Sequence, residues 1–152
     1  MTQRLAWAKA APGAYEAMSG LERYAKANVD PDLYELVKLR ASHLNGCAYC
    51  VDMHAHDALK QGENLQRILL VGVWREAEDL YTAKERAALA LTEEVTELSS
   101  SGGHGVGDEV WAAAAAEFDE VELTNLLTAI VTINGWNRFA VSTRMTIPTR
   151  TA

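Results

Sequence analysis

Residues that start and stop helices recur along the whole chain and constrain its fold more than any other feature. Asp30 and Pro31 form a cap residue followed by proline at the first helical position, and Gly46 is a typical helix stop. Thr82 and Glu85 have the spacing of a capping box. No stretch shows the sustained alternation of a half-buried strand. These signals predict helices over residues 14–28, 30–44, 47–61, 63–73, 82–98, 108–118 and 119–144.

This pattern predicts an all-α chain, a single-domain helical bundle of about six to seven helices over residues 1–152. A length of 152 residues fits one domain, and 49% hydrophobic residues exclude a disordered chain. A net charge of −7 repels phosphates and anionic lipids, so we expect neither nucleic-acid nor membrane binding. No apolar run approaches the roughly 20 residues that span a bilayer, and the first residues lack a signal-peptide core. A cytoplasmic protein is therefore expected.

Cys47 and Cys50 are the only cysteines, and they stand as Cys-x-x-Cys. Secreted proteins stapled by disulfides use more cysteines at longer spacings, because closing a short loop removes little entropy from the unfolded chain. In a reducing compartment, such a pair indicates redox chemistry or metal binding.

Cys47, Cys50 and His54 fall within an arc of about 60° on the predicted third helix. His54 follows Cys50 by four residues, the spacing at which helical side chains meet, so its imidazole can take the thiol proton. The thiolate is the nucleophilic form of cysteine, and the first turn of a helix stabilises an anion. Cys47 lies one turn away, where it can trap a sulfenic acid on Cys50 as a disulfide. These three residues predict a dithiol centre with its own base.

Two further ionisable residues belong to the neighbourhood of this centre. Glu35 lies twelve residues before Cys47, among apolar neighbours. If the chain folds back at Gly46, Glu35 can approach His54 and fix the tautomer of the imidazole. His56 points to the opposite face of a regular helix, so a surface or interface position is expected for it.

Other interpretations of the cysteine pair stay open at this point. Cys47, Cys50, His54 and His56 can be read as a zinc site, although structural zinc normally joins two separated ligand pairs. Two inert cysteines can also pack in the core as small hydrophobic side chains. A thioredoxin-like fold is disfavoured because no strand precedes the motif.

The chain resembles the alkylhydroperoxidase D-like branch of the carboxymuconolactone decarboxylase superfamily. The matching pattern is Glu35, eleven intervening residues, Cys47-Ala48-Tyr49-Cys50, three residues, and His54. The surrounding segment LVKLRASHLNGCAYCVDMHAHDALKQGE is similar to the core segment of that branch, and INGWNRFAVSTR, near the C-terminus, is similar to its tail. The resemblance covers most of the chain, from about residue 34 to residue 144.

The resemblance implies an all-α fold, a thiol-dependent peroxidase activity and a homo-oligomer, either a trimer or a hexamer. It implies no haem, flavin or metal cofactor. Carried over by position, Glu35 and His54 form a proton relay, Cys50 attacks a hydroperoxide and Cys47 closes the disulfide. A separate dithiol protein then reduces that disulfide.

One position departs from the family pattern. The peroxidase form carries a histidine just before the second cysteine, and this chain carries Tyr49 there. A phenol is a poorer proton shuttle than an imidazole near neutral pH, so peroxidase turnover is expected to be weaker. The order of attack also stays open, because the helix start favours Cys47 whereas the histidine spacing favours Cys50.

Functions of other classes remain compatible with these residues. A disulfide carrier or redox sensor exchanges electrons with protein partners without strong peroxidase activity. An acid–base enzyme of the carboxymuconolactone decarboxylase type uses His54 and Glu35 and tolerates the loss of both cysteines. In an oligomeric binding or scaffold protein the cysteines are incidental.

Aromatic residues outside the motif lead to two structural expectations. Trp74 and Tyr81 flank a link between helices, where an exposed apolar patch would suit oligomerisation. Polar and aromatic groups mix on the last helix at Asn134, Trp136, Asn137 and Arg138. They can close over the dithiol pocket or lie at a subunit contact, and we expect a structural role for them.

Overall fold

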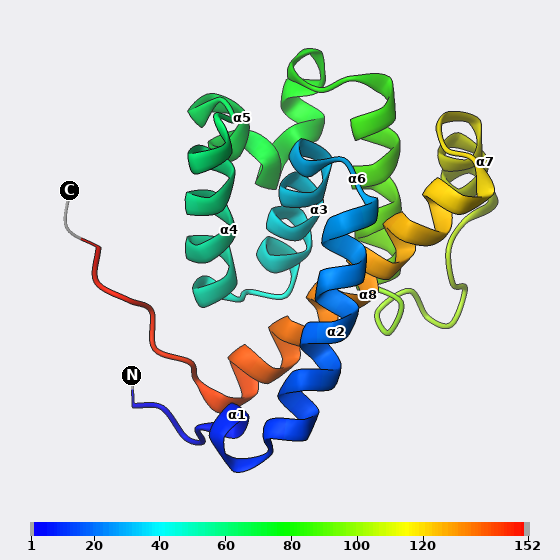
Figure 1. Cartoon of the computed structure of the whole chain (residues 1–152). Coiled ribbons are helices and arrows are strands. Elements are labelled where there is room, and N and C mark those ends of the chain that lie inside the picture. Colours follow the sequence, from blue (N-terminus) through cyan, green and yellow to red (C-terminus); the bar gives the residue numbers. More distant parts are fainter. Residues whose placement is uncertain (1, 151–152) are drawn as a thin grey trace.

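The computed structural model describes residues 2–150, and the regular elements within that range are all helical (Figure 1). The all-α prediction is therefore confirmed, with eight α-helices in place of the six to seven expected. The α-helices are α1 Trp7–Ala10, α2 Pro12–Asn28, α3 Pro31–Leu44, α4 Ala48–Gln61, α5 Leu65–Leu70, α6 Ala83–Thr96, α7 Asp108–Glu117 and α8 Glu120–Thr143, and the 3-10 segment η1 spans Val71–Leu80. None of the helices in this range has the length and apolarity needed to cross a bilayer.

Helix α3 is the central element of the bundle. Asp30 caps it, because its side-chain oxygen accepts two backbone N–H bonds from the first turn, at 3.1 and 3.2 Å. Residues 33–39 are all buried, and α3 packs against α4, α6, α8 and η1. Two of these buried residues, Glu35 and Lys38, carry charge and therefore need partners inside the protein.

A short turn folds α4 back against α3 as an antiparallel hairpin (Figure 1). Gly46 supplies the left-handed backbone that the turn requires, with φ +62°. Cys47 then becomes the N-cap of α4, and its Sγ accepts a hydrogen bond from the backbone N–H of Cys50 at 3.4 Å. The cap places both cysteines at the start of α4, next to the turn.

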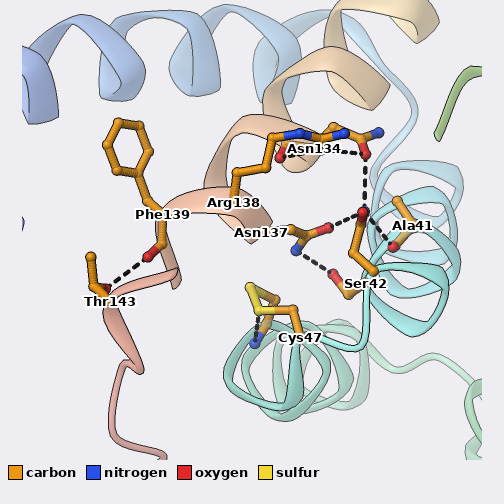
Figure 2. Close-up of a disulfide and its surroundings, with 10 residues drawn as sticks. Ala41, Ser42, Cys47, Asn134, Asn137, Arg138, Phe139 and Thr143 are labelled. Atoms are coloured by element: carbon orange, nitrogen blue, oxygen red, sulfur yellow. Dashed lines mark hydrogen bonds between the residues drawn. A yellow bond between two sulfur atoms is a disulfide. The ribbon is translucent and has the colours of Figure 1, made fainter. Parts of the chain in front are cut away.

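Polar side chains of α8 hold this turn in place (Figure 2). Asn45 Nδ2 donates to the side-chain oxygens of Asn134 and Asn137, each at 2.9 Å. Asn137 Nδ2 donates to Ser42 Oγ at 3.1 Å. Arg138 donates to Asn134 Oδ1 at 3.0 Å. These contacts agree with the structural role expected for this part of the last helix.

Two regions differ from the sequence-based prediction. Residues 7–10 form α1, a single turn that no sequence signal predicted, and the helical segment after residue 63 continues as η1 as far as residue 80. The expectation of an exposed patch at Trp74 and Tyr81 is wrong, because these side chains are only 3% and 2% exposed. The polar atom of each ring finds an internal partner at 2.7 Å, so both rings can be buried.

Candidate active site

A cavity of about 310 Å³ opens between the α3–α4 hairpin and helices from the two ends of the chain. Its volume lies at the lower end of the range of roughly 300–1,000 Å³ that is typical of small-molecule sites. The hairpin contributes Glu35, Lys38, Cys50 and His54 to its lining, and α1, α2 and α8 contribute Trp7, Tyr15 and Trp136.

Cys47 and Cys50 are joined as a disulfide, with their Cα atoms 5.4 Å apart. Both residues are buried, each 2% exposed, and they pack against Ala41, Ile133 and Ala140. Of the two cysteines, Cys50 lines the cavity. The pair is therefore accessible from the cavity on the Cys50 side.

The structure brings Glu35 and His54 together across the hairpin. His54 Nδ1 lies 2.8 Å from Glu35 Oε2, and both side chains are almost completely buried. His54 Nε2 is also buried, and it has no hydrogen-bond partner among the described residues. Since Nδ1 faces Glu35, the free nitrogen is the one that can serve a ligand or a cysteine in the cavity.

The zinc interpretation is not supported by this geometry. His56 lies apart from the cysteines, because its Nδ1 contacts the backbone carbonyl of Asp52 at 2.7 Å, and its side chain is 38% exposed. Within residues 2–150, the one group of three side chains close enough to hold a metal ion is Glu35, His54 and Asp57, which contains no cysteine.

A second ion pair, between the buried Lys38 and the partly exposed Glu22, also lines the cavity. The carboxylate of Glu22, on α2, accepts hydrogen bonds from Lys38 Nζ and Tyr34 OH, both on α3. Its other oxygen accepts a hydrogen bond from Trp136 Nε1 of α8 at 2.9 Å. The Lys38 side chain is 1% exposed, and Nζ lies 4.3 Å from the centroid of the Tyr34 ring. Three helices therefore meet at a single carboxylate.

Burial and these contacts shift the pKa values of the network. For Glu22, burial alone would raise the pKa, but the charge of Lys38 and the three hydrogen bonds outweigh it and lower the pKa. Burial lowers the pKa of Lys38, against the attraction of Glu22 and Glu35. Burial and the hydrogen bond to Glu22 raise the pKa of Tyr34. At neutral pH the network thus holds an ionised carboxylate and a neutral phenol.

Aromatic rings form another part of the cavity lining. The centroids of Trp7, Tyr15 and Trp136 lie 5.6–5.7 Å from one another. Trp7 also stacks on Phe139, with the centroids 4.0 Å apart and the planes at 12°. The cavity therefore has a charged wall on the hairpin and an aromatic wall built from α1, α2 and α8.

Sequence patterns did not point to Glu22, Lys38 or, apart from Trp136, the aromatic wall. One signal for Lys38 is present, because Glu35 and Lys38 stand three residues apart in an otherwise apolar stretch of α3. Residues at that spacing share a helix face, so both charges had to enter the same buried region. Nothing local marks Glu22 or Trp7, which reach the cavity through long-range packing.

Known proteins resemble this chain in sequence. The family model for the carboxymuconolactone decarboxylase family matches residues 10–94. The uncharacterised protein YdfG of Bacillus subtilis (strain 168) is 38% identical over 143 residues, which cover 93% of this chain and 95% of that protein. The uncharacterised protein YnjA of Escherichia coli (strain K12) is 31% identical over 128 residues, which cover 84% of this chain and 66% of that protein.

Solved structures share the fold. A protein of unknown function from Agrobacterium tumefaciens, ATU0492, named as a candidate antioxidant defence protein AhpD, superposes with a TM-score of 0.92. It is 38% identical, and the match covers 98% of this chain and 100% of that one. The debrominase Bmp8 superposes with a TM-score of 0.76 over 90% of this chain and 72% of its own. At 22% identity, Bmp8 shows a common fold alone.

Proposed function

Since this chain belongs to the carboxymuconolactone decarboxylase family, we propose that it is a thiol-dependent peroxidase that reduces organic hydroperoxides or hydrogen peroxide. The observation that carries the proposal is the arrangement in one cavity of Cys50 and His54, with Glu35 bound behind the imidazole at 2.8 Å. A nucleophilic thiol is activated by an adjacent base, and a third group orients that base.

In the reduced protein, His54 takes the proton of the Cys50 thiol, and Glu35 stabilises the imidazolium that forms. The thiolate attacks the terminal oxygen of the hydroperoxide. An S–O bond forms, the O–O bond breaks, and the electron pair of that bond leaves on the alkoxide. His54 returns its proton to the alkoxide, which departs as an alcohol, and Cys50 is left as a sulfenic acid.

Cys47 completes the cycle, because its thiol attacks the sulfur of the sulfenic acid. The disulfide forms, and the hydroxyl group leaves as water with the proton of the Cys47 thiol. The sum of these steps oxidises two thiols to a disulfide and reduces the hydroperoxide to an alcohol and water. We propose that a cytoplasmic dithiol protein reduces the disulfide, and that no metal or other cofactor takes part.

Two observations support organic hydroperoxides as substrates and antioxidant defence as the role. The aromatic wall offers an apolar surface that hydrogen peroxide cannot use but an organic body can. ATU0492, which is 38% identical, is itself named as a candidate antioxidant defence protein.

The test is a stopped-flow titration of free thiols after addition of one equivalent of cumene hydroperoxide to the reduced protein. We expect the wild type to lose two thiols together, much faster than free cysteine reacts. Cys50→Ser should react no faster than free cysteine. Cys47→Ser is the matched control, and it should lose its single thiol rapidly because Cys50 keeps His54.

The two variants also decide the order of attack. If Cys47→Ser is inert and Cys50→Ser is fast, the roles of the cysteines are reversed. If the wild type keeps both thiols, or loses them at the rate of free cysteine, the protein is not a peroxidase of this kind.

Acid–base catalysis on a cyclic acid is a second candidate function, in line with the name of the family. Its support is that the contact between Glu35 and His54 involves neither cysteine. The double variant Cys47→Ser/Cys50→Ser separates the two candidates, because it would keep acid–base activity and lose peroxidase activity.

We also propose that the protein forms a homo-oligomer, a trimer or a hexamer. Leu65 and Leu69 are 54% and 68% exposed and share one face of α5, since they are four residues apart, and Val73, 55% exposed, follows in η1. We expect Leu69→Glu to lower the mass measured by light scattering, whereas Val121→Glu, equally exposed at the start of α8, should not. An unchanged mass in Leu69→Glu would place the interface elsewhere.

A further inference from the structure

Lys38 presents a buried positive charge to the cavity. Its side chain is 1% exposed, and Nζ is bound by a single carboxylate, that of Glu22. An ammonium group has three N–H donors, so two of them remain beyond the hydrogen bond to Glu22. Burying an ammonium is unfavourable unless its charge is compensated. Here the carboxylate of Glu22 compensates it, and hydrogen bonds from Tyr34 and Trp136 hold that carboxylate in place.

The register of the hairpin brings Lys38 to the level of Cys50. In an antiparallel pair, moving forward along one helix corresponds to moving backward along the other. Glu35 on α3 faces His54 on α4 at 2.8 Å. Three residues forward from Glu35 is Lys38, and four residues back from His54 is Cys50, so both lie about one turn from that contact in the same direction.

The cavity is lined by carboxylates whose negative charge a buried cation can balance. Glu22 on α2 and Glu35 on α3 both face Lys38. The cavity is also lined by other charged or titratable side chains, which are Lys26, Tyr34, His54, Asp57, Tyr15 and Tyr49. Lys26 is exposed, whereas Lys38 and Glu35 are buried and the Glu22 side chain is 25% exposed. When the Cys50 thiolate forms, it adds a further negative charge to this group.

We propose that Lys38 is a further catalytic residue, whose ammonium, held in place by Glu22, stabilises the Cys50 thiolate and the alkoxide that leaves the hydroperoxide. The inference rests on the proposed peroxidase function. In the attack step, the O–O bond breaks and its electron pair stays on the alkoxide oxygen. Lys38 donates a hydrogen bond to that oxygen while His54 returns the proton, so Lys38 itself loses no proton.

The test uses the Cys47→Ser background, in which Cys50 is the single thiol. The thiolate of Cys50 is titrated against pH by its ultraviolet absorbance, with Lys38 intact and in Lys38→Met. We expect Lys38→Met to move the titration midpoint upward by about one pH unit. We also expect it to slow the reaction with cumene hydroperoxide at pH 7 about tenfold or more.

Three control variants separate charge from structure. Lys38→Arg should restore most of the titration midpoint, because it restores the charge. Lys38→Gln keeps a hydrogen-bond donor to Glu22 but removes the positive charge, and it provides the test if Lys38→Met does not fold. Lys60→Met removes an exposed lysine, 72% accessible, from the last turn of α4 and should change neither readout.

The two readouts distinguish the two proposals. If the midpoint does not move in Lys38→Met, or in Lys38→Gln where Lys38→Met does not fold, Lys38 does not stabilise the thiolate and the inference is overturned. If the midpoint moves but the variant with Lys38 intact reacts with peroxide no faster than free cysteine, the peroxidase proposal fails. A midpoint that moves together with a slower peroxide reaction supports both.

Discussion

The two walls of the cavity are built in opposite ways. The hairpin wall takes Glu35, Lys38, Cys50 and His54 from two helices that are adjacent in sequence and joined by a three-residue turn. The aromatic wall takes its rings from α1, α2 and α8, at the two ends of the chain. Reactive groups thus come from local structure, whereas the surface that faces them depends on long-range packing. We expect substitutions in the first wall to change chemistry, and substitutions in the second to change which substrates fit.

Trp136 connects the two walls. Its ring packs at 5.6–5.7 Å from Tyr15 and Trp7, while its Nε1 donates to Glu22 at 2.9 Å. Glu22 in turn holds Lys38, so the aromatic wall fixes the position of a charge on the hairpin. Trp136 therefore contributes both to the apolar surface of the cavity and to the position of a charged group.

The largest effect is expected from Glu35→Gln in the hairpin wall. A neutral amide no longer stabilises the imidazolium of His54, and it does not select the tautomer that leaves Nε2 free for the thiol proton. We expect the rate constant for thiol loss with cumene hydroperoxide to fall about 100-fold, within the range of general acid–base catalysis. Glu16→Gln, an exposed position on α2, is the control and should react as the wild type does. A change of less than about threefold in Glu35→Gln would remove Glu35 from the mechanism.

A smaller and selective effect is expected from Trp7→Leu in the aromatic wall. The substitution removes the stacking on Phe139 at 4.0 Å and part of the apolar surface that faces the thiol. We expect kcat/KM for cumene hydroperoxide to fall about tenfold, equivalent to the loss of one or two aromatic contacts, and kcat/KM for hydrogen peroxide to fall much less.

The matched control is Trp111→Leu, which removes a 44% exposed tryptophan from α7. It should leave both kcat/KM values unchanged. If Trp7→Leu lowers kcat/KM equally for the two peroxides, the aromatic wall does not select the substrate.

The contrast also explains which features the sequence could predict. The helix signals around Asp30, Gly46 and Thr82 are local, and the helices that they predict are present. The spacing of Cys50 and His54 on one helix, and the turn that returns Glu35 to them, are local as well. Glu22 comes to Lys38 from another helix, and no pattern in a single segment records that contact.

The failures have the same cause. Trp74 and Tyr81 are large apolar residues at a link between helices, a position that suggests exposure. Both belong to a buried apolar cluster, and residues elsewhere in the chain accept hydrogen bonds from their polar atoms. Trp7 lies in a four-residue helix, too short to show any periodicity, and its place is set by its packing on Phe139 and Trp136.

The link between the walls can be tested by acid unfolding. The pKa of Glu22 is lowered in the folded state, so in the unfolded state Glu22 binds a proton at a higher pH than in the folded state. Its contribution to stability is therefore complete above its ordinary value of about 4.5 and is lost as the pH falls below it, through the folded-state pKa. We expect the free energy of unfolding to fall less between pH 6 and pH 3 in Glu22→Gln than in the wild type, when both are measured by urea titration. Equal losses in the two proteins would show that Glu22 does not link the walls energetically.

The smallest effect is expected where the C-terminal segment crosses the hairpin wall. Met145 lines the cavity, and Arg150 forms a two-point ion pair with Asp52 of α4, at 3.0 and 2.7 Å. Met145 also packs against the apolar cluster that contains the disulfide, whose cysteines are each 2% exposed. Because exposed ion pairs are weak and screened by salt, we expect Arg150→Gln to speed reduction of the disulfide by a small dithiol only about twofold.

Arg23→Gln, which breaks an exposed ion pair on α2, is the matched control and should not change the rate of reduction. Raising the salt concentration should speed reduction in the wild type and leave Arg150→Gln unaffected, because the salt then has no ion pair to screen. If Arg150→Gln and the wild type are reduced at the same rate at low salt, the C-terminal segment does not restrict access. Reductant would then reach Cys50 through the cavity alone, and the aromatic wall would select the reductant as well as the peroxide.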